Sequence, residues 1–110
     1  MDSESVKNYL FLSMAVKVFH QDREILQLSN LPLKETYVMI INQAIESCQQ
    51  DLQKVNKKLS RQGIKVVQKK REKSFTLYKC YNRQSEKQFS LNHQTIREEV
   101  ALIMRKYLQK

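Results

Sequence analysis

The side chains that could support chemistry are few in this 110-residue chain, and they lie far apart. The two histidines, His20 and His93, have no second histidine, cysteine or acid at the spacing that metal ligands need. Cys48 and Cys80 form no CxxC pattern, which indicates two reduced, partly buried thiols. The sequence therefore predicts no catalytic residue, no metal site and no cofactor.

Glycine and carboxylate patterns typical of enzymes are also missing. A phosphate-binding loop needs several glycines, and this chain has one, Gly63. Glu98 and Glu99 are adjacent, so in a helix they point in different directions and do not form a pair of catalytic carboxylates. We therefore expect a protein that is not an enzyme, built as one domain over residues 1–110.

Positive charge is concentrated in the middle of the chain. Residues 54–90 carry twelve lysines and arginines against two acidic residues, a local charge of +10, whereas the other residues sum to −1. Clustered basic side chains neutralise phosphates and release counterions, which favours a surface for nucleic acid. A solvated surface, or docking of an acidic protein or a membrane surface, would give the same composition.

Our leading hypothesis is that this basic region contacts nucleic acid, without strong sequence specificity, because no helix-turn-helix with a basic recognition helix is found. Tyr78 and Tyr81 lie in the region and could stack on bases, with packing beneath helices as the alternative for both. The residues expected to bind nucleic acid are Lys57, Lys58, Arg61, Lys65, Lys69, Lys70, Arg71, Lys73, Tyr78, Lys79 and Arg83.

Two long helices are expected in the first part of the chain. The first, over residues 3–28, is capped by Ser3 or Ser5 and could break at the polar residues 20–24. Its apolar residues lie on two sides, which indicates burial between two layers or against another chain.

The second helix, expected over residues 32–62, shows a heptad seam, and Gly63 is suited to its left-handed C-cap. A short turn joins the two helices, so we expect a helical hairpin within one chain. A homodimer, or another protein–protein assembly through the apolar helices, is the alternative function. The seam consists of Val38, Ile41, Ile45, Cys48, Leu52, Val55 and Leu59.

Three strands and a last helix complete the prediction. A β-prone run that begins at residues 64–67, and a second over residues 75–81, predict a hairpin with a polar tip at residues 71–74. Lys65, Lys69 and Arg71 alternate along one face of its first strand, and residues 87–91 predict a third strand. The last helix begins at residue 92, or at residue 95 through a capping box closed by Glu98, and ends at residue 108.

This order is α-α-β-β-β-α, an α+β fold with a long second helix. We expect its three-stranded antiparallel meander to carry the helices on one face.

No membrane segment is expected. The most apolar stretch, residues 9–19, is shorter than the ~20 residues that a spanning helix needs, and Lys17 interrupts it. The start of the chain lacks the basic residues of a signal peptide. We therefore expect a cytoplasmic protein whose partner is nucleic acid, a second copy of the chain or an acidic protein.

Four short motifs are shared with a known group of proteins. They are Leu33-Lys34-Glu35-Thr36-Tyr37-Val38, Arg61-Gln62-Gly63-Ile64-Lys65-Val66, Phe75-Thr76-Leu77-Tyr78 and Met104-Arg105-Lys106-Tyr107-Leu108. Through them the chain resembles the YhjD-like group of small cytosolic proteins from Gram-positive bacteria and their mobile elements. The resemblance implies a bacterial origin and supplies no site residue.

Overall fold

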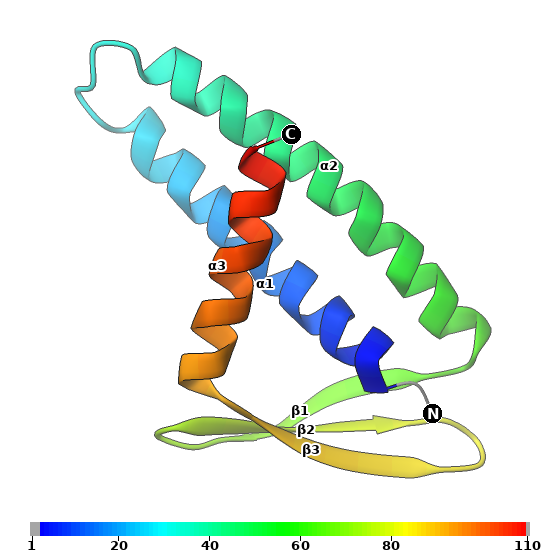
Figure 1. The fold of residues 1–110 in the computed structure, drawn as a ribbon. Helices are drawn as coiled ribbons and strands as arrows, with labels where there is room; N and C mark the ends of the chain where they lie inside the picture. Colours follow the sequence, from blue (N-terminus) through cyan, green and yellow to red (C-terminus); the bar gives the residue numbers. More distant parts are fainter. Residues whose placement is uncertain (1–2, 110) are drawn as a thin grey trace.

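The chain folds into three helices and a three-stranded antiparallel sheet in the predicted order α-α-β-β-β-α (Figure 1). The computed structural model describes residues 3–109. Its elements are α1 (Ser3–Gln27), α2 (Lys34–Arg61), β1 (Lys65–Arg71), β2 (Phe75–Tyr81), β3 (Glu86–Asn92) and α3 (His93–Leu108).

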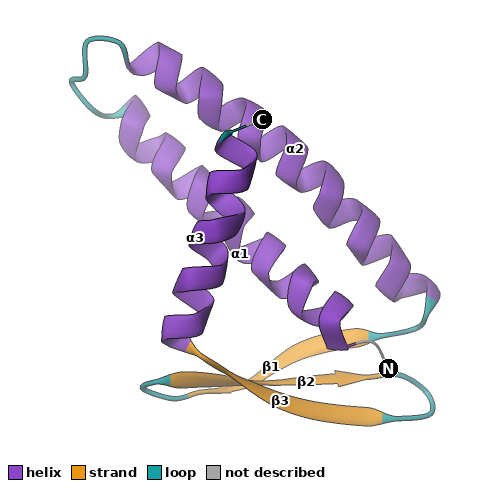
Figure 2. Ribbon diagram, in the orientation of Figure 1, coloured by secondary structure: helices purple, strands orange, loops and turns teal. Residues whose placement is uncertain are grey.

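The helices form a layer on one side of the sheet. α1 and α2 make a long antiparallel hairpin, and α3 crosses α1 (Figure 2). The sheet, in the order β1-β2-β3, lies at the end of the hairpin where α1 begins and α2 ends. All three helices lie on the same side of the sheet, so its other face is left uncovered (Figure 1).

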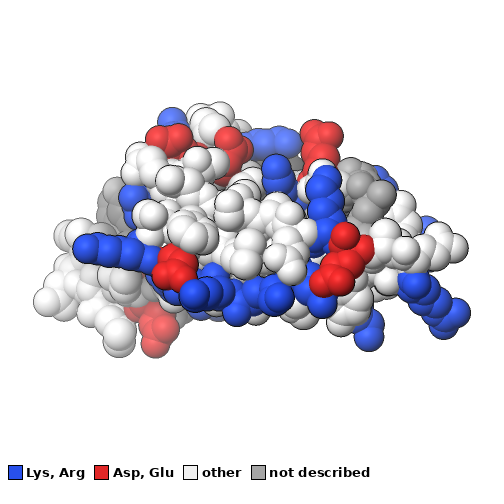
Figure 3. Space-filling view, turned by 90° about the horizontal axis from the view of Figure 1, so that it is seen from below, with Lys and Arg blue, Asp and Glu red and all other residues white. Residues whose placement is uncertain are grey.

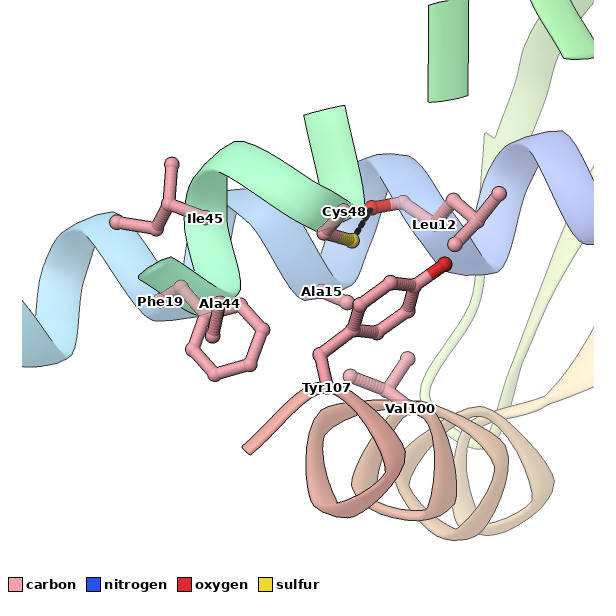
Figure 4. Close-up of a cluster of buried hydrophobic side chains, with 8 residues drawn as sticks. All are labelled: Leu12, Ala15, Phe19, Ala44, Ile45, Cys48, Val100 and Tyr107. Atoms are coloured by element: carbon pink, nitrogen blue, oxygen red, sulfur yellow. Dashed lines mark hydrogen bonds between the residues drawn. The ribbon is translucent and has the colours of Figure 1, made fainter. Parts of the chain in front are cut away.

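The predicted heptad seam is the side of α2 that packs within the chain. Ile45 and Cys48 of the seam are buried in one cluster with Leu12 and Phe19 of α1 (Figure 4). Val100 and Tyr107 of α3 join the same cluster, so α1 is covered by α2 and by α3. This arrangement explains the apolar residues on two sides of α1, and it confirms the hairpin within one chain.

A hydrogen bond ties the end of α3 to the middle of α2. The Tyr107 hydroxyl donates to Oδ2 of Asp51 over 2.5 Å. Burial, and then the bond to the Asp51 carboxylate, raise the pKa of Tyr107 well above its usual range. The hydroxyl therefore stays neutral in the folded protein far into the alkaline range.

Gly63 ends α2 and directs the chain into the sheet. Its φ of +69° is the left-handed conformation predicted for it. The Ile64 N–H donates to the Leu59 carbonyl over 2.9 Å and the Gly63 N–H to the Ser60 carbonyl over 3.0 Å, which is the Schellman pattern. Ile64 and Leu59 are then buried together in a second cluster, with Val6 of α1 and Cys80 of β2.

The structure decides the alternatives that the sequence left open for the helices, whose boundaries lie within two residues of the prediction. α1 continues through residues 20–24 without a break, and Ser3 and Ser5 lie inside it, so its cap falls outside the described residues. α2 begins at Lys34, after a turn at residues 31–33. α3 begins at His93, next to the predicted start at residue 92 and not at the alternative capping box, because the Asn92 side chain accepts the Gln94 N–H over 2.7 Å.

Replacing Leu12 by alanine should lower the free energy of unfolding by about 2–5 kcal/mol, because it leaves a cavity between the helices. Urea unfolding followed by circular dichroism measures the loss. Leu102→Ala is the matched control, because Leu102 is 54% exposed on α3 whereas Leu12 is 4% exposed. We expect the control to stay within about 0.5 kcal/mol of the wild type, and equal losses would contradict this placement of Leu12.

Tyr107→Phe should cost about 1 kcal/mol at pH 7, because the hydrogen bond to Asp51 is lost. Above pH ~10 the unfolded tyrosine ionises while the folded one stays neutral, so the wild type loses stability that the variant retains. The difference in the free energy of unfolding between the wild type and Tyr107→Phe should therefore shrink as the pH rises above about 10. Urea unfolding on both sides of that pH tests this, with Tyr37→Phe, an exposed tyrosine, as the control. A constant difference would contradict the raised pKa.

Candidate nucleic-acid interface

The uncovered face of the sheet is set by the alternation of side chains along β2. Thr76, Tyr78 and Cys80 are buried beneath the helices, so the residues between them turn to the other side. Phe75, at the start of the strand, is 38% exposed. The outward set of β2 consists of Phe75, Leu77, Lys79 and Tyr81.

β1 adds basic side chains to this face. Lys65 pairs with Tyr81 and Val67 pairs with Lys79 across the two strands, so all four side chains lie on the same side of the sheet. Lysine stems and an apolar side chain therefore border the aromatic ring of Tyr81.

A β-bulge between Gln68 and Lys70 changes the alternation along β1. Beyond the bulge, Lys70 lies opposite Leu77 and faces outward. Arg71 lies opposite the buried Thr76 and faces the helices. The bulge thus moves one basic residue onto the uncovered face and another away from it.

Glu86 of β3 lies opposite Tyr81 and so faces outward, and the charge of Lys69, at the bulge, acts on it, which places Lys69 on the uncovered face. The hydrogen bond from Lys79 lowers the pKa of the Glu86 carboxyl, and the charge of Lys69 lowers it further. The prediction that Lys65, Lys69 and Arg71 share one face is therefore wrong for Arg71. We call the resulting surface the open face: Lys65, Val67, Lys69, Lys70, Phe75, Leu77, Lys79 and Tyr81.

Two lysines of the open face have carboxylate partners. Lys79 Nζ lies 2.7 Å from Glu86 Oε1 and 5.2 Å from the centre of the Tyr81 ring. Lys70 Nζ lies 2.8 Å from Glu72 Oε1. The hydrogen bonds to these carboxylates raise the pKa of both lysines, so they stay charged at neutral pH.

Figure 3 views the open face directly. Basic side chains gather along one edge of it and at its ends, and uncharged side chains fill its centre. β1 is an edge strand of the sheet and carries Lys65, Lys69 and Lys70. The arrangement is a row of positive charge beside a central uncharged strip.

The remaining predicted residues lie at the two ends of the sheet. Lys73 is in the turn after β1. The length of β1, about 23 Å, separates this turn from the end of the sheet into which α2 leads. Lys58 Nζ donates to Ser5 Oγ over 3.0 Å, so this side chain is directed toward α1. Residues at or near that end are Lys57, Lys58, Arg61 and Arg83.

Tyr78 is on the helix side of the sheet, where it is 5% exposed and stacks on Phe89 with ring centres 5.8 Å apart. Its ring is not available to bases, so we correct the prediction by removing Tyr78 from the stacking surface. Tyr81 keeps its place on the open face. Phe75 was not assigned to the site from sequence, although its shared parity with Lys79 along β2 was an available signal.

Elsewhere in residues 3–109 no group of three His, Cys, Asp or Glu side chains is placed to hold a metal ion. His93 Nε2 lies 2.8 Å from Thr76 Oγ1, and His20 contacts Arg23 and Gln49. Both cysteines are buried, in separate clusters. Over the same residues, no helix is both long and apolar enough to cross a membrane.

Comparison with known proteins gives a relative but no structural neighbour. A family model described as "YhjD protein" matches residues 1–110. The chain is similar to "Uncharacterized protein YhjD" of Bacillus subtilis (strain 168), with 31% identity over 103 residues, which cover 94% of this chain and 86% of the relative. No solved structure matches significantly. The resemblance drawn from the four sequence motifs is thereby confirmed.

Proposed function

The chain belongs to the YhjD protein family, and we propose that it is a non-catalytic module whose open face binds single-stranded nucleic acid without strong sequence specificity. The observation that carries this proposal is the position of two outward-facing rings, the exposed Phe75 and the half-buried Tyr81, beside the lysines of β1 and β2. Aromatic rings on a sheet surface can stack on unpaired bases, and neighbouring lysines neutralise the phosphates between them.

Single strands are favoured over duplexes by the shape of the surface. A sheet face that presents rings needs bases that are unstacked and turned toward it, and bases in a duplex are not available in this way. The lysines of the open face also lie on strands, three of them along the edge strand β1, rather than on a helix that could enter a major groove. Contacts of this kind go to phosphates and ring faces, which carry little sequence information.

Binding of a fluorescent single-stranded oligonucleotide of about 12 nucleotides, followed by anisotropy, tests the proposal. If about four phosphates are neutralised, the logarithm of the binding constant should fall with the logarithm of salt concentration with a slope of roughly −2.8. Lys65→Ala with Lys69→Ala should reduce the magnitude of that slope by about 1.4, because two phosphate contacts are lost.

Arg105→Ala with Lys106→Ala is the matched control, because it removes the same charge from exposed positions on α3. Equal weakening by both double variants would mean that net charge alone matters, and that result contradicts a specific face. Glu86→Gln should strengthen binding, because it frees Lys79 from its ion pair. Duplex DNA or structured RNA bound more tightly than the single strand would argue against stacking on the sheet.

A second candidate function, self-association, is favoured by exposed apolar residues where α1 and α2 are joined. Leu28 and Ile25 are 81% and 67% exposed there, and Leu31, Tyr37 and Ile40 line one apolar depression. Exposed apolar patches mark interaction sites. Since the heptad seam is already packed within the chain, we assign the assembly to this apolar tip, which holds the most exposed of the large apolar side chains. The tip consists of Ile25, Leu28, Leu31, Leu33, Tyr37, Met39 and Ile40.

Charge favours a second copy of the chain at the apolar tip. Residues 22–37 carry two basic and three acidic side chains, so two tips can approach each other without strong repulsion. The +10 region lies at the other end of the α1–α2 hairpin, where it would be kept apart from its copy (Figure 1).

Sedimentation velocity over a range of protein concentrations tests this second function. We expect a dimer for the wild type, a monomer for Leu28→Gln with Met39→Gln, and a dimer for the control Leu102→Gln, whose exposed leucine lies on α3. A wild type that stays monomeric throughout would exclude association through the tip.

A further inference from the structure

A cleft lies on the helix side of the sheet, between α1, the two strands β1 and β2, and the start of α3. Its volume is about 390 Å³. Three basic side chains from three different elements line it: Lys17 of α1, Arg71 of β1 and Arg97 of α3. The cleft is separate from the open face, because Arg71 is the residue that the β-bulge turns toward the helices.

Polar groups of the cleft are arranged to donate hydrogen bonds. The Tyr78 ring is buried, its side chain lines the cleft, and within residues 3–109 its hydroxyl has no hydrogen-bond partner. Burial raises the pKa of this hydroxyl, with the charge of Arg71 acting in the opposite direction, so it stays a donor at neutral pH. Thr76 and His93, joined by their 2.8 Å contact, complete the polar wall.

Carboxylates are missing from this wall. The Arg97 guanidinium donates to the Gln94 side chain over 2.8 Å, and Gln94 in turn donates to Glu98 over 2.9 Å. The hydrogen-bond partner of Arg97 is therefore an amide and not a carboxylate. None of the described residues that line the cleft is an aspartate or a glutamate. Three cations with a free hydroxyl and no carboxylate make a site that is complementary to an anion.

The cleft continues into an apolar groove between α1 and α3. This groove has a volume of about 480 Å³ and shares four lining residues with the cleft: Met14, Lys17, Ile96 and Arg97. Beyond the shared residues its walls are mostly apolar, formed by Val18, Val100, Ala101 and Met104 together with Gln21. Each of the two volumes falls in the range of roughly 300–1,000 Å³ that is usual for small-molecule sites.

We propose that the cleft and the groove together bind a small organic anion with an apolar chain, such as an alkyl carboxylate. The head would lie among Lys17, Arg71 and Arg97, where it accepts hydrogen bonds and neutralises their charge. The chain would lie along the groove between α1 and α3, where it is removed from water. This site is independent of the proposed nucleic-acid surface, because the two lie on opposite faces of the sheet.

Titration of ¹⁵N-labelled protein with octanoate, below the concentration at which it forms micelles, tests the proposal by amide chemical shifts. Acetate supplies the head alone and 1-octanol supplies the chain alone. We expect saturable shifts for residues of α1, β2 and α3 that line the site, with octanoate binding at least about fivefold more tightly than either fragment. Combining Lys17→Gln with Arg97→Gln should weaken the binding of octanoate by about fivefold or more. Arg105→Gln, an exposed arginine of α3 outside the site, should leave binding unchanged.

Four results would overturn the proposal. Three of them are no saturable shift with octanoate, equal binding of octanoate and octanol, and octanoate affinity that is the same in the double variant as in the wild type. Acetate binding as tightly as octanoate would also overturn it, because the groove would then contribute nothing. Lys17 and Arg97 are exposed, so their replacement does not disturb the core. Oligonucleotide affinity is a separate readout, and its loss or retention decides only the function of the open face.

Discussion

Helix α1 carries apolar residues on two sides, and both sides must be covered by other elements. This requirement determines where the other helices and the sheet lie. α2 covers one side through its heptad seam, and α3 closes the other through Val100 and Tyr107. Near the start of α1, Val6 is buried against the sheet in one cluster with Cys80 of β2. Each fully buried side chain of this size contributes about 1.5–3 kcal/mol, so the two-sided contact is a large part of the driving force for the fold.

Covering α1 leaves no helix for the other face of the sheet. A three-stranded sheet with helices on one side presents its second face to solvent, and here that face carries lysines around aromatic and aliphatic side chains. β2 is shared between the two sides. Thr76 and Tyr78 line the cleft, while Leu77 and Lys79 point the other way. One strand therefore sets the geometry of both candidate sites.

Features that depend on neighbours in sequence could be predicted from the sequence. The heptad seam of α2 is a local periodicity, and the C-cap at Gly63 needs a residue without Cβ, so both were predictable. The order of elements followed from changes in periodicity. The start of α3 was less certain, because Asn92 and Thr95 are both suitable caps and the choice depends on where β3 stops.

The candidate site was harder to predict, because it depends on strand pairing. The charge of residues 54–90 was visible, but which lysines share a face was decided by the bulge at Gln68 and Lys70. Lys79 shares the face of Tyr81, but so do the apolar Phe75 and Leu77, so strand parity alone did not decide which of Tyr78 and Tyr81 is buried. The cleft joins Lys17, Arg71 and Arg97, which are brought together only by the crossing of α3 over α1 and the sheet.

The bulge in β1 has a consequence for how molecules of this protein meet one another in a crowded cell. A straight edge strand exposes a row of backbone donors and acceptors to which the strand of another molecule can add, and repeated addition leads to fibrils. In β1 the bulge interrupts that row, and Lys69 and Lys70 place two like charges where an incoming strand would have to lie. The same residues that present positive charge to a ligand thus protect the β1 edge of the sheet from edge-to-edge aggregation.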